Sequence, residues 1–305
     1  MKQKQLSKLI QIDVPEAVLE EGRIILLSIS PDFNVAPVEA AFTKTLSLYR
    51  GTYPGYRACN TRFHDLHHTT DTFLAMGRML HGAVLNSKLF DEHNITVGLI
   101  SALLHDAGYI QEEHDTKGTG AKYTENHIQR SMKFLQREAD NFCLSDKDVD
   151  AGCAMILCSD LGVDVSNITF PSSEIELLGR ILGIADLIAQ MADRIYLEKL
   201  EFLYQEFKEA EVGDYKNEVD FFKKTMEFYD FIEQRQKQIL DETDLFLTSH
   251  FAARWGIRKN LYSDAVENQK NYLKEILEIP NSDPRDYLKR DGIVERVRNN
   301  NSDDD

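Results

Sequence analysis

Histidine and aspartate are crowded into one short stretch of the chain, FHDLHHTTD, at residues 63–71. The whole sequence has nine histidines in 305 residues, and three of them fall here. On a helix, His64 and His68 are four residues apart and Asp71 follows His68 by three, so these side chains share a face. His67 points elsewhere. Imidazoles and a carboxylate on one face favour a metal or proton-transfer site. A surface helix with several histidines is the alternative.

Two further stretches bring ionisable residues into apolar surroundings. In ISALLHDAGY, His105 and Asp106 follow a run of apolar residues. In GRILGIADLIAQ, Asp186 lies inside an apolar helical pattern. A buried carboxylate without a partner is destabilising or becomes protonated, so each aspartate needs a cation nearby. For Asp106 the alternative is a helix end, with the carboxylate capping the next turn around Gly108.

Together these stretches predict one ligand set, made of His68, His105, Asp106 and Asp186. Two nitrogens and two oxygens suit divalent iron, manganese, zinc, cobalt or nickel better than calcium, which prefers oxygen ligands. A carboxylate such as Asp106 can also bridge to a second, more hydrated ion, often magnesium or manganese. We therefore expect two divalent metal ions, with a transition metal at the first site.

Composition and charge exclude several classes of protein. The net charge is −16, which argues against a nucleic-acid polymer as partner because phosphate backbones need clustered lysine and arginine. No stretch approaches the ~20 apolar residues of a membrane span, so we expect a cytoplasmic protein without a membrane partner. The four cysteines form no CxxC pair, which favours free thiols.

Apolar residues recur mainly at helical spacing, and strand alternation is almost absent, which predicts an all-α protein. The stretch 94–109 is apolar nearly all round, so we expect a buried helix there. The other expected helices are 38–50, 69–85, 125–139, 174–208 (one long helix or two), 218–246 and 263–279.

The chain reads as a single all-α unit over residues 1–305, with a core at about 40–210. Residues 211–290 are expected to form peripheral helices, and 296–305 a disordered acidic tail. Aromatic residues recur along 198–233, and we interpret them as core or as the surface of a homodimer.

The ordered series of histidines and aspartates resembles that of the HD-domain metal-dependent phosphohydrolases. FHDLHHTTDT is similar to the Y-H-N-x-x-H-A-x-D-V stretch of class I cyclic nucleotide phosphodiesterases, with His64, His68 and Asp71 matching. YTENHIQRS resembles the family's L-E-N-H-H stretch, and Asp186 falls where the family has its last metal-binding aspartate. The resemblance spans roughly residues 40–200 and implies an HD-domain, phosphodiesterase-like helical bundle.

The resemblance also implies roles for individual residues. His68, His105, Asp106 and Asp186 would hold the first metal, and Asp106 would bridge to the second. Two metals would neutralise the substrate phosphate and activate the attacking water. His64 would be the general acid that protonates the leaving oxygen, and Glu125 would help to hold the water. The expected activity is hydrolysis of a small phosphomonoester or phosphodiester, with a nucleotide as the first candidate.

Other residues of these motifs are expected near the metals or the substrate: Asp65, Asp71, Asn126, His127 and Lys122. Lys122 lies in the loop GTGAKYTENH, where the alternative is a solvated loop with Thr124 as the N-cap of the next helix. The chain also departs from the family. Asp65 replaces an asparagine and adds charge beside His64, and Ile128 replaces a histidine.

Specificity for cyclic nucleotides does not carry over from the resemblance. The family holds the purine with a glutamine on a late helix, and none of Gln234, Gln236 and Gln238 aligns with it. Two other functions stay open. A di-iron oxygenase would need further histidine ligands, for which His127 and His114 are the candidates, and a non-catalytic metal-binding sensor would be expected to lack a ligand.

Overall fold

The computed structural model describes residues 5–302, and in this range it contains twelve α-helices and no β-strand. The prediction of an all-α protein is confirmed. The helices are α1 (Pro15–Ile29), α2 (Ala36–Tyr49), α3 (Leu66–Leu85), α4 (Glu92–Leu104), α5 (His127–Glu138), α6 (Asp146–Leu157), α7 (Ser173–Ala192), α8 (Tyr196–Glu209), α9 (Glu218–Ile239), α10 (Thr243–Trp255), α11 (Leu261–Leu277) and α12 (Ile293–Ser302). No helix within residues 5–302 is long and apolar enough to cross a membrane. All four cysteines are free thiols, as expected.

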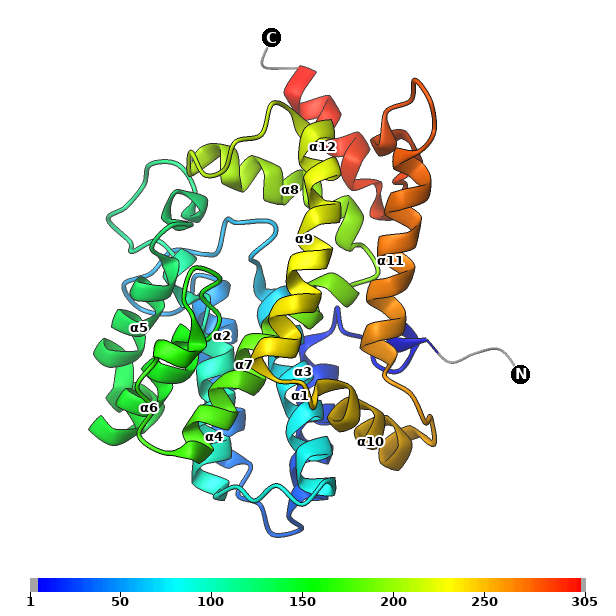
Figure 1. Ribbon diagram of the computed structural model, residues 1–305. Coiled ribbons are helices and arrows are strands. Elements are labelled where there is room, and N and C mark those ends of the chain that lie inside the picture. Colours follow the sequence, from blue (N-terminus) through cyan, green and yellow to red (C-terminus); the bar gives the residue numbers. More distant parts are fainter. Residues whose placement is uncertain (1–4, 303–305) are drawn as a thin grey trace.

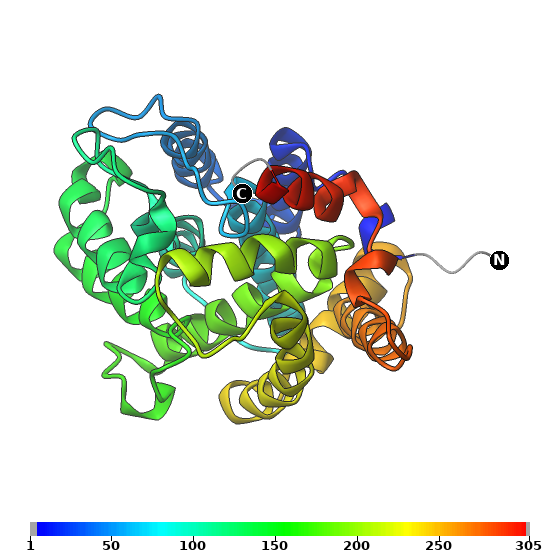
Figure 2. The same cartoon turned by 90° about the horizontal axis from the view of Figure 1, so that it is seen from above.

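Helix α3 is the centre of the fold, because every residue from 68 to 83 is buried. Helices α1, α4, α7 and α10 pack around it, and Figures 1 and 2 show α3 enclosed by its neighbours in both views. The sequence predicted a helix at 69–85 without indicating how many of its faces are buried. The structure encloses all faces, so the polar residues of its first turns are held inside the protein.

Helix α10 approaches α3 closely at a glycine. A Cβ atom added to Gly82 would lie 1.8 Å from the carbonyl oxygen of Phe246 in α10. Only a residue without a side chain lets the two backbones reach this separation. At Gly77, on the same helix, an added Cβ would meet only side-chain atoms of Ile25 at 3.7 Å, which is ordinary contact.

The buried helix predicted at 94–109 ends earlier than expected. Helix α4 stops at Leu104, His105 is its C-cap, and a 3-10 turn, η2, covers Ala107–Tyr109. Gly108 lies in this turn, and an added Cβ there would be 1.9 Å from the carbonyl oxygen of His127. The missing side chain therefore lets the start of α5 lie directly against the turn that carries His105 and Asp106.

The long pattern at 174–208 is two helices, separated where Asp193 adopts extended backbone (ψ 132°). The pattern at 218–246 is also divided, with α9 ending at Ile239 and α10 beginning at Thr243. Helices α1 and α6 were not predicted. Helix α6 begins with a capping box between Ser145 and Asp148, a local signal that apolar periodicity does not report.

The C-terminal segment differs from the prediction of a disordered tail at 296–305. Residues 296–302 belong to α12, and Val294 and Val297 on this helix are buried. Burial of these two side chains holds the helix against α8 and outweighs the polar composition of the segment. Residues 303–305 lie outside the described part of the chain.

Buried apolar side chains form two clusters. The larger one surrounds α3 and α4. The second lies mainly between α8, α9, α11 and α12 and also includes Phe63, Leu187 and Met191. The C-terminal helices therefore pack on the loop before α3 and on the end of α7, and this contact positions α8 and α9 beside the polar residues predicted to do chemistry.

The contact between α3 and α10 makes a prediction about stability. Gly82→Ala should lower the free energy of unfolding by about 1–3 kcal/mol, because the new methyl group forces the helices apart. Gly77→Ala is the matched control, and it should be neutral or stabilising by up to ~1 kcal/mol through helix propensity. Urea unfolding followed by circular dichroism gives both values, and equal midpoints for the two variants would contradict the prediction.

Candidate metal centre

The polar side chains at the start of α3 and at the end of α4 meet inside the protein. The Nε2 atoms of His68 and His105 are 3.3 Å apart, and Asp106 Oδ2 lies 3.4 Å from each of them. All three residues are buried, and one ligand atom from each lies within 4.8 Å of the others. The two imidazoles and the carboxylate can therefore face a single ion.

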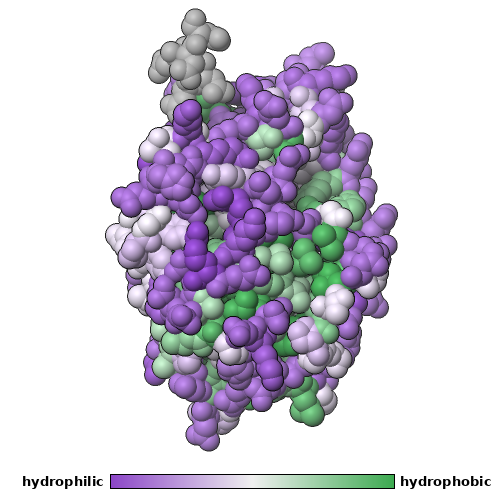
Figure 3. Space-filling model, turned by 90° about the vertical axis from the view of Figure 1, so that its left-hand side faces the viewer, coloured by the Kyte–Doolittle hydropathy of each residue, from purple (hydrophilic) through white to green (hydrophobic). Residues whose placement is uncertain are grey.

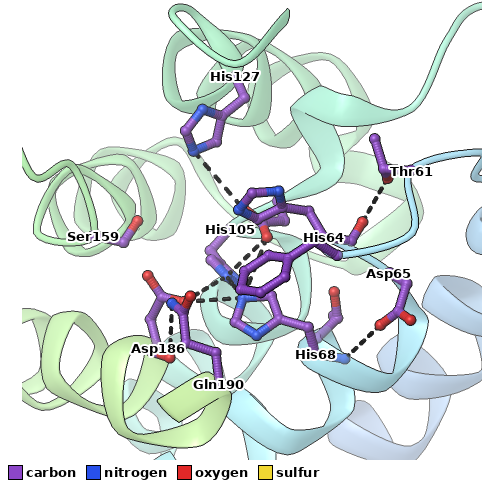
Figure 4. A network of polar contacts seen from close by, with 12 residues as sticks. Thr61, His64, Asp65, His68, His105, His127, Ser159, Asp186 and Gln190 are labelled. Atoms are coloured by element: carbon purple, nitrogen blue, oxygen red, sulfur yellow. Dashed lines mark hydrogen bonds and ion pairs between the residues drawn. The ribbon is translucent and has the colours of Figure 1, made fainter. Parts of the chain in front are cut away.

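Asp186 joins this group from α7. Its Oδ1 atom lies 3.0 Å from His68 Nε2 and 3.4 Å from His105 Nε2. Figure 4 shows these side chains pointing toward a common centre from different helices. The structure brings together the four residues predicted as the ligand set, and we refer to them as the ligand group.

Hydrogen bonds leave suitable atoms of the ligand group free for a metal. His105 Nδ1 donates to the carbonyl oxygen of Ala102 at 2.8 Å, which leaves Nε2 as the atom that faces the group. Asp106 Oδ2 is buried and accepts no hydrogen bond of good geometry from any residue in 5–302. Buried oxygen atoms without partners are rare, and a divalent cation would satisfy this one.

The charges of the ligand group stabilise one another. Burial opposes protonation of His68, but contacts with Asp106 and Asp186 outweigh burial and raise its pKa to about 10. For Asp106 burial favours the neutral acid, yet His105 and His68 hold the pKa of this carboxyl well below its usual range. The same two histidines lower the pKa of Asp186. The pKa of His105 is raised as well, so without a metal both imidazoles favour protonation, and a bound ion would compete with that protonation.

His64 lies beside the ligand group and is oriented by a carboxylate that the sequence did not single out. His64 Nδ1 is 2.7 Å from Oε2 of Glu206 in α8. The other oxygen of Glu206 accepts hydrogen bonds from the backbone nitrogens of Arg62 and Phe63, each at 2.7 Å. Glu206 thus fixes both the loop and the ring. Its position between Leu203 and Phe207, on the apolar side of α8, is the signal that could have identified it.

Three aromatic rings form a stack next to the ligand group. His64 stacks on Tyr109 with ring centroids 4.4 Å apart, and Tyr109 stacks on His127 at 4.5 Å. His127 Nε2 lies 3.7 Å from Asp106 Oδ1, and its Nδ1 is 2.6 Å from the carbonyl oxygen of Thr124. His127, predicted to lie near the metals or substrate, is therefore within reach of an ion bound at Asp106.

A pocket of about 340 Å³ opens onto the ligand group. Asp106 and Asp186 lie in its wall together with His64, Glu125 and His127. Part of the aromatic stripe predicted as core or dimer surface also lines it: Phe207, Tyr215, Phe221 and Phe228. The stripe is therefore divided, since Phe222 and Tyr229 are buried in the core.

Several residues predicted near the metals or substrate lie elsewhere. Lys122 is 2.6 Å from Asp115 Oδ1 and donates to the carbonyl oxygen of Lys117, so its charge is paired within its own loop. Asn126 is the N-cap residue of α5, a place predicted for Thr124, and its side chain is exposed. Gln190 of α7 lines the pocket. The described residues of the wall do not include the three glutamines of α9, Gln234, Gln236 and Gln238.

Asp65 and Asp71 belong to a second polar cluster outside the ligand group. Asp65 caps α3 by accepting a hydrogen bond from the backbone nitrogen of His68 at 2.9 Å, and it lies 3.6 Å from Lys199 Nζ. Asp71 Oδ2 is 3.0 Å from His67 Nε2. The carboxylate of Asp65, expected to lie beside His64, thus faces the first turn of α3 and Lys199.

The geometry predicts which substitutions abolish metal binding. Asp106→Ala and Asp186→Ala should each weaken binding of manganese or zinc by more than the roughly 10–100-fold typical of a residue outside the ligand set. Asp71→Asn should retain the metal, because Asp71 faces His67. Mass spectrometry of metal content after dialysis checks this, and loss of metal from Asp71→Asn alone would contradict the assignment of ligands.

The raised pKa of His68 predicts that metal binding releases a proton. Between pH 7 and about 10, the dissociation constant should fall about tenfold per pH unit, since the ion competes with one proton. Calorimetric titration in two buffers of different ionisation enthalpy should report about one proton released per ion. An affinity independent of pH above 7 would contradict the raised pKa of His68.

Compared with known proteins, the chain matches no protein-family model, and no curated protein is similar to it at a significant level.

Proposed function

We propose that this protein is a metal-dependent phosphohydrolase that hydrolyses a small phosphate ester, built on an HD-domain-like helical bundle. The observation that supports this most strongly is the buried group of two histidines and two aspartates at the end of a pocket, with His64 beside it. These residues follow one another along the chain in the same order as the motifs of the HD-domain phosphohydrolases, which the sequence resembles.

The residues of the ligand group fit a divalent ion in type and environment. His68, His105, Asp106 and Asp186 would hold it, and Asp106 Oδ2, which has only contacts of 3.4 Å with the two imidazoles, would gain a closer partner. When bound, the ion would offset the negative charge of the phosphate and lower the pKa of the attacking water. Asp106 Oδ1, on the side of His127, is left to accept a second ion.

His64 is suited to donate a proton to the leaving oxygen. Its Nδ1 is paired with Glu206, so the protonated ring can donate from Nε2 into the pocket that His64 lines. The Glu206 carboxylate, 2.7 Å from Nδ1, sets the orientation of the ring. Tyr109 packs on one face of the ring and prevents it from turning away. A leaving alkoxide is a strong base, so a general acid at this position contributes directly to the rate.

A di-iron oxygenase is the second candidate, and the position of His127 favours it. A histidine 3.7 Å from Asp106 supplies an additional nitrogen ligand of the kind that a second iron would need. The two candidates predict different properties of the purified protein. The oxygenase would contain iron with visible absorption and would consume oxygen, whereas the phosphohydrolase would be active with manganese in the absence of oxygen.

Hydrolysis of bis-p-nitrophenyl phosphate with added manganese tests the proposed function. Wild-type protein should turn over this ester, and His64→Asn should reduce its hydrolysis only slightly, because p-nitrophenolate is a weak base. With an alkyl phosphate ester, whose leaving alkoxide is a strong base, His64→Asn should lower kcat by roughly 100- to 10,000-fold, the usual contribution of a general acid, while binding metal normally. Glu206→Gln should also lower kcat, but less than His64→Asn does, because the ring and the loop before α3 lose the carboxylate that positions them.

Glu209→Gln, three residues further along α8, is the matched control for Glu206. Glu209 bonds the backbone and hydroxyl of Thr119 at 2.5 Å and has no part in orienting His64. It should retain wild-type kcat and pH dependence. Full metal occupancy without turnover of any phosphate ester would reject the phosphohydrolase.

A further inference from the structure

The wall of the pocket away from the ligand group is formed by apolar side chains of α7, α8 and α9. These include Leu187, Leu200, Leu203, Phe207, Phe221 and Phe228. Leu203, Phe207 and Phe228 are only partly buried, as expected for side chains that face a pocket. Figure 3 shows hydrophobic surface bordered by hydrophilic surface on the side of the molecule where α5 and α6 lie.

The hydroxyl groups in the wall donate their protons to the backbone. Thr124 and Ser159 each donate to the carbonyl oxygen three residues earlier, at 2.7 Å. Thr225 donates to the carbonyl oxygen four residues earlier, at 3.0 Å. Such bonds within a helix or turn use the hydroxyl protons, so these groups can accept a hydrogen bond from a ligand but cannot donate one.

The longer polar side chains of the wall also have partners. Gln190 Nε2 lies 3.4 Å from the carbonyl oxygen of Asp186. Lys224 Nζ donates to the carbonyl oxygen of Asp214 and lies 3.5 Å from Asp220 Oδ2. The free polar groups of the described wall, such as Gln190 Oε1 and the carboxylates of Glu125 and Asp160, therefore come from segments before α8, and the part formed by α8 and α9 offers few free donors or acceptors apart from tyrosine hydroxyls. A nucleobase placed here would exchange hydrogen bonds with water for contacts with carbon.

From this wall we infer the substrate class of the proposed phosphohydrolase: a phosphate ester whose alcohol part is an aromatic or branched apolar group, not a nucleotide. The inference rests on the proposed function, because the ligand group must hold the phosphate. The phosphate would lie against Asp106, Asp186 and their bound ions. The apolar group would lie between α8 and α9, where Phe207, Phe221 and Phe228 would enclose it.

Binding of phosphonates, which are not hydrolysed, tests the inference separately from catalysis. We would titrate manganese-loaded protein with 1-naphthylmethylphosphonate, methylphosphonate and adenosine monophosphate in a calorimeter. The naphthyl compound should bind at least about tenfold more tightly than either of the others, with a negative change in heat capacity from apolar burial.

Two phenylalanines of α9 provide matched variants. Phe228 lines the pocket, whereas Phe231, one turn further, is 44% exposed and is not among the described residues of the wall. Phe228→Ser should weaken binding of the naphthyl compound at least about fivefold and leave methylphosphonate unchanged. Phe231→Ser should weaken binding of the naphthyl compound less, because Phe231 acts on the pocket only through its stacking on Phe228, with ring centroids 6.2 Å apart.

The outcomes separate this inference from the proposed function. Equal or tighter binding of adenosine monophosphate, or equal effects of Phe228→Ser and Phe231→Ser, would overturn the apolar substrate class even if bis-p-nitrophenyl phosphate is hydrolysed. A preference for the naphthyl compound that depends on Phe228 would support it even if hydrolysis of that ester fails. In that case only the reaction type would be wrong.

Discussion

The structure depends on the pairing of two buried carboxylates with two imidazoles in the interior of a helical protein. None of His68, His105, Asp106 and Asp186 would be stable there alone, since burial penalises every charged form. Each lies within 3.4 Å of a group of opposite charge. The arrangement holds α3, α4 and α7 in one register, because a small shift of any helix would leave a buried charge without a partner.

A second set of contacts connects the helices of the ligand group to α8 and α9, which follow in the chain. Glu206 binds the loop before α3 through two backbone nitrogens, and Phe63 of that loop is part of the apolar cluster of α8 and α9. The pocket is consequently shared between the two halves of the chain. The polar end comes mainly from residues before 190, and most of the apolar wall comes from residues after it.

The proximity of the ligand group could be predicted from sequence, because a polar residue in an apolar stretch needs a buried partner. One shared site satisfies this need for all of its members: His68, His105, Asp106 and Asp186. Residues in polar loops gave no such constraint. Lys122 pairs with Asp115 in its own loop, and Asp65 caps the start of α3. Glu206 was missed because its contact with His64 joins residues that are far apart in the sequence. Gln190 was missed because the sequence does not show which residues line the pocket. The central position of α3 was missed for the same reason, since periodicity reports one helix face and not the number of neighbours.

The stack of His64, Tyr109 and His127 has a geometric consequence for the whole site. Tyr109 closes the same 3-10 turn that follows His105 and Asp106, so a single short segment supplies both metal-facing atoms and the spacer between two other imidazoles. The centroids of those two imidazoles are 6.3 Å apart, less than the sum of their distances to Tyr109, so both rings are offset from the centre of the phenol. Because Tyr109 contacts both imidazoles, a change of side chain at this one position would alter the surroundings of His64 and His127 together.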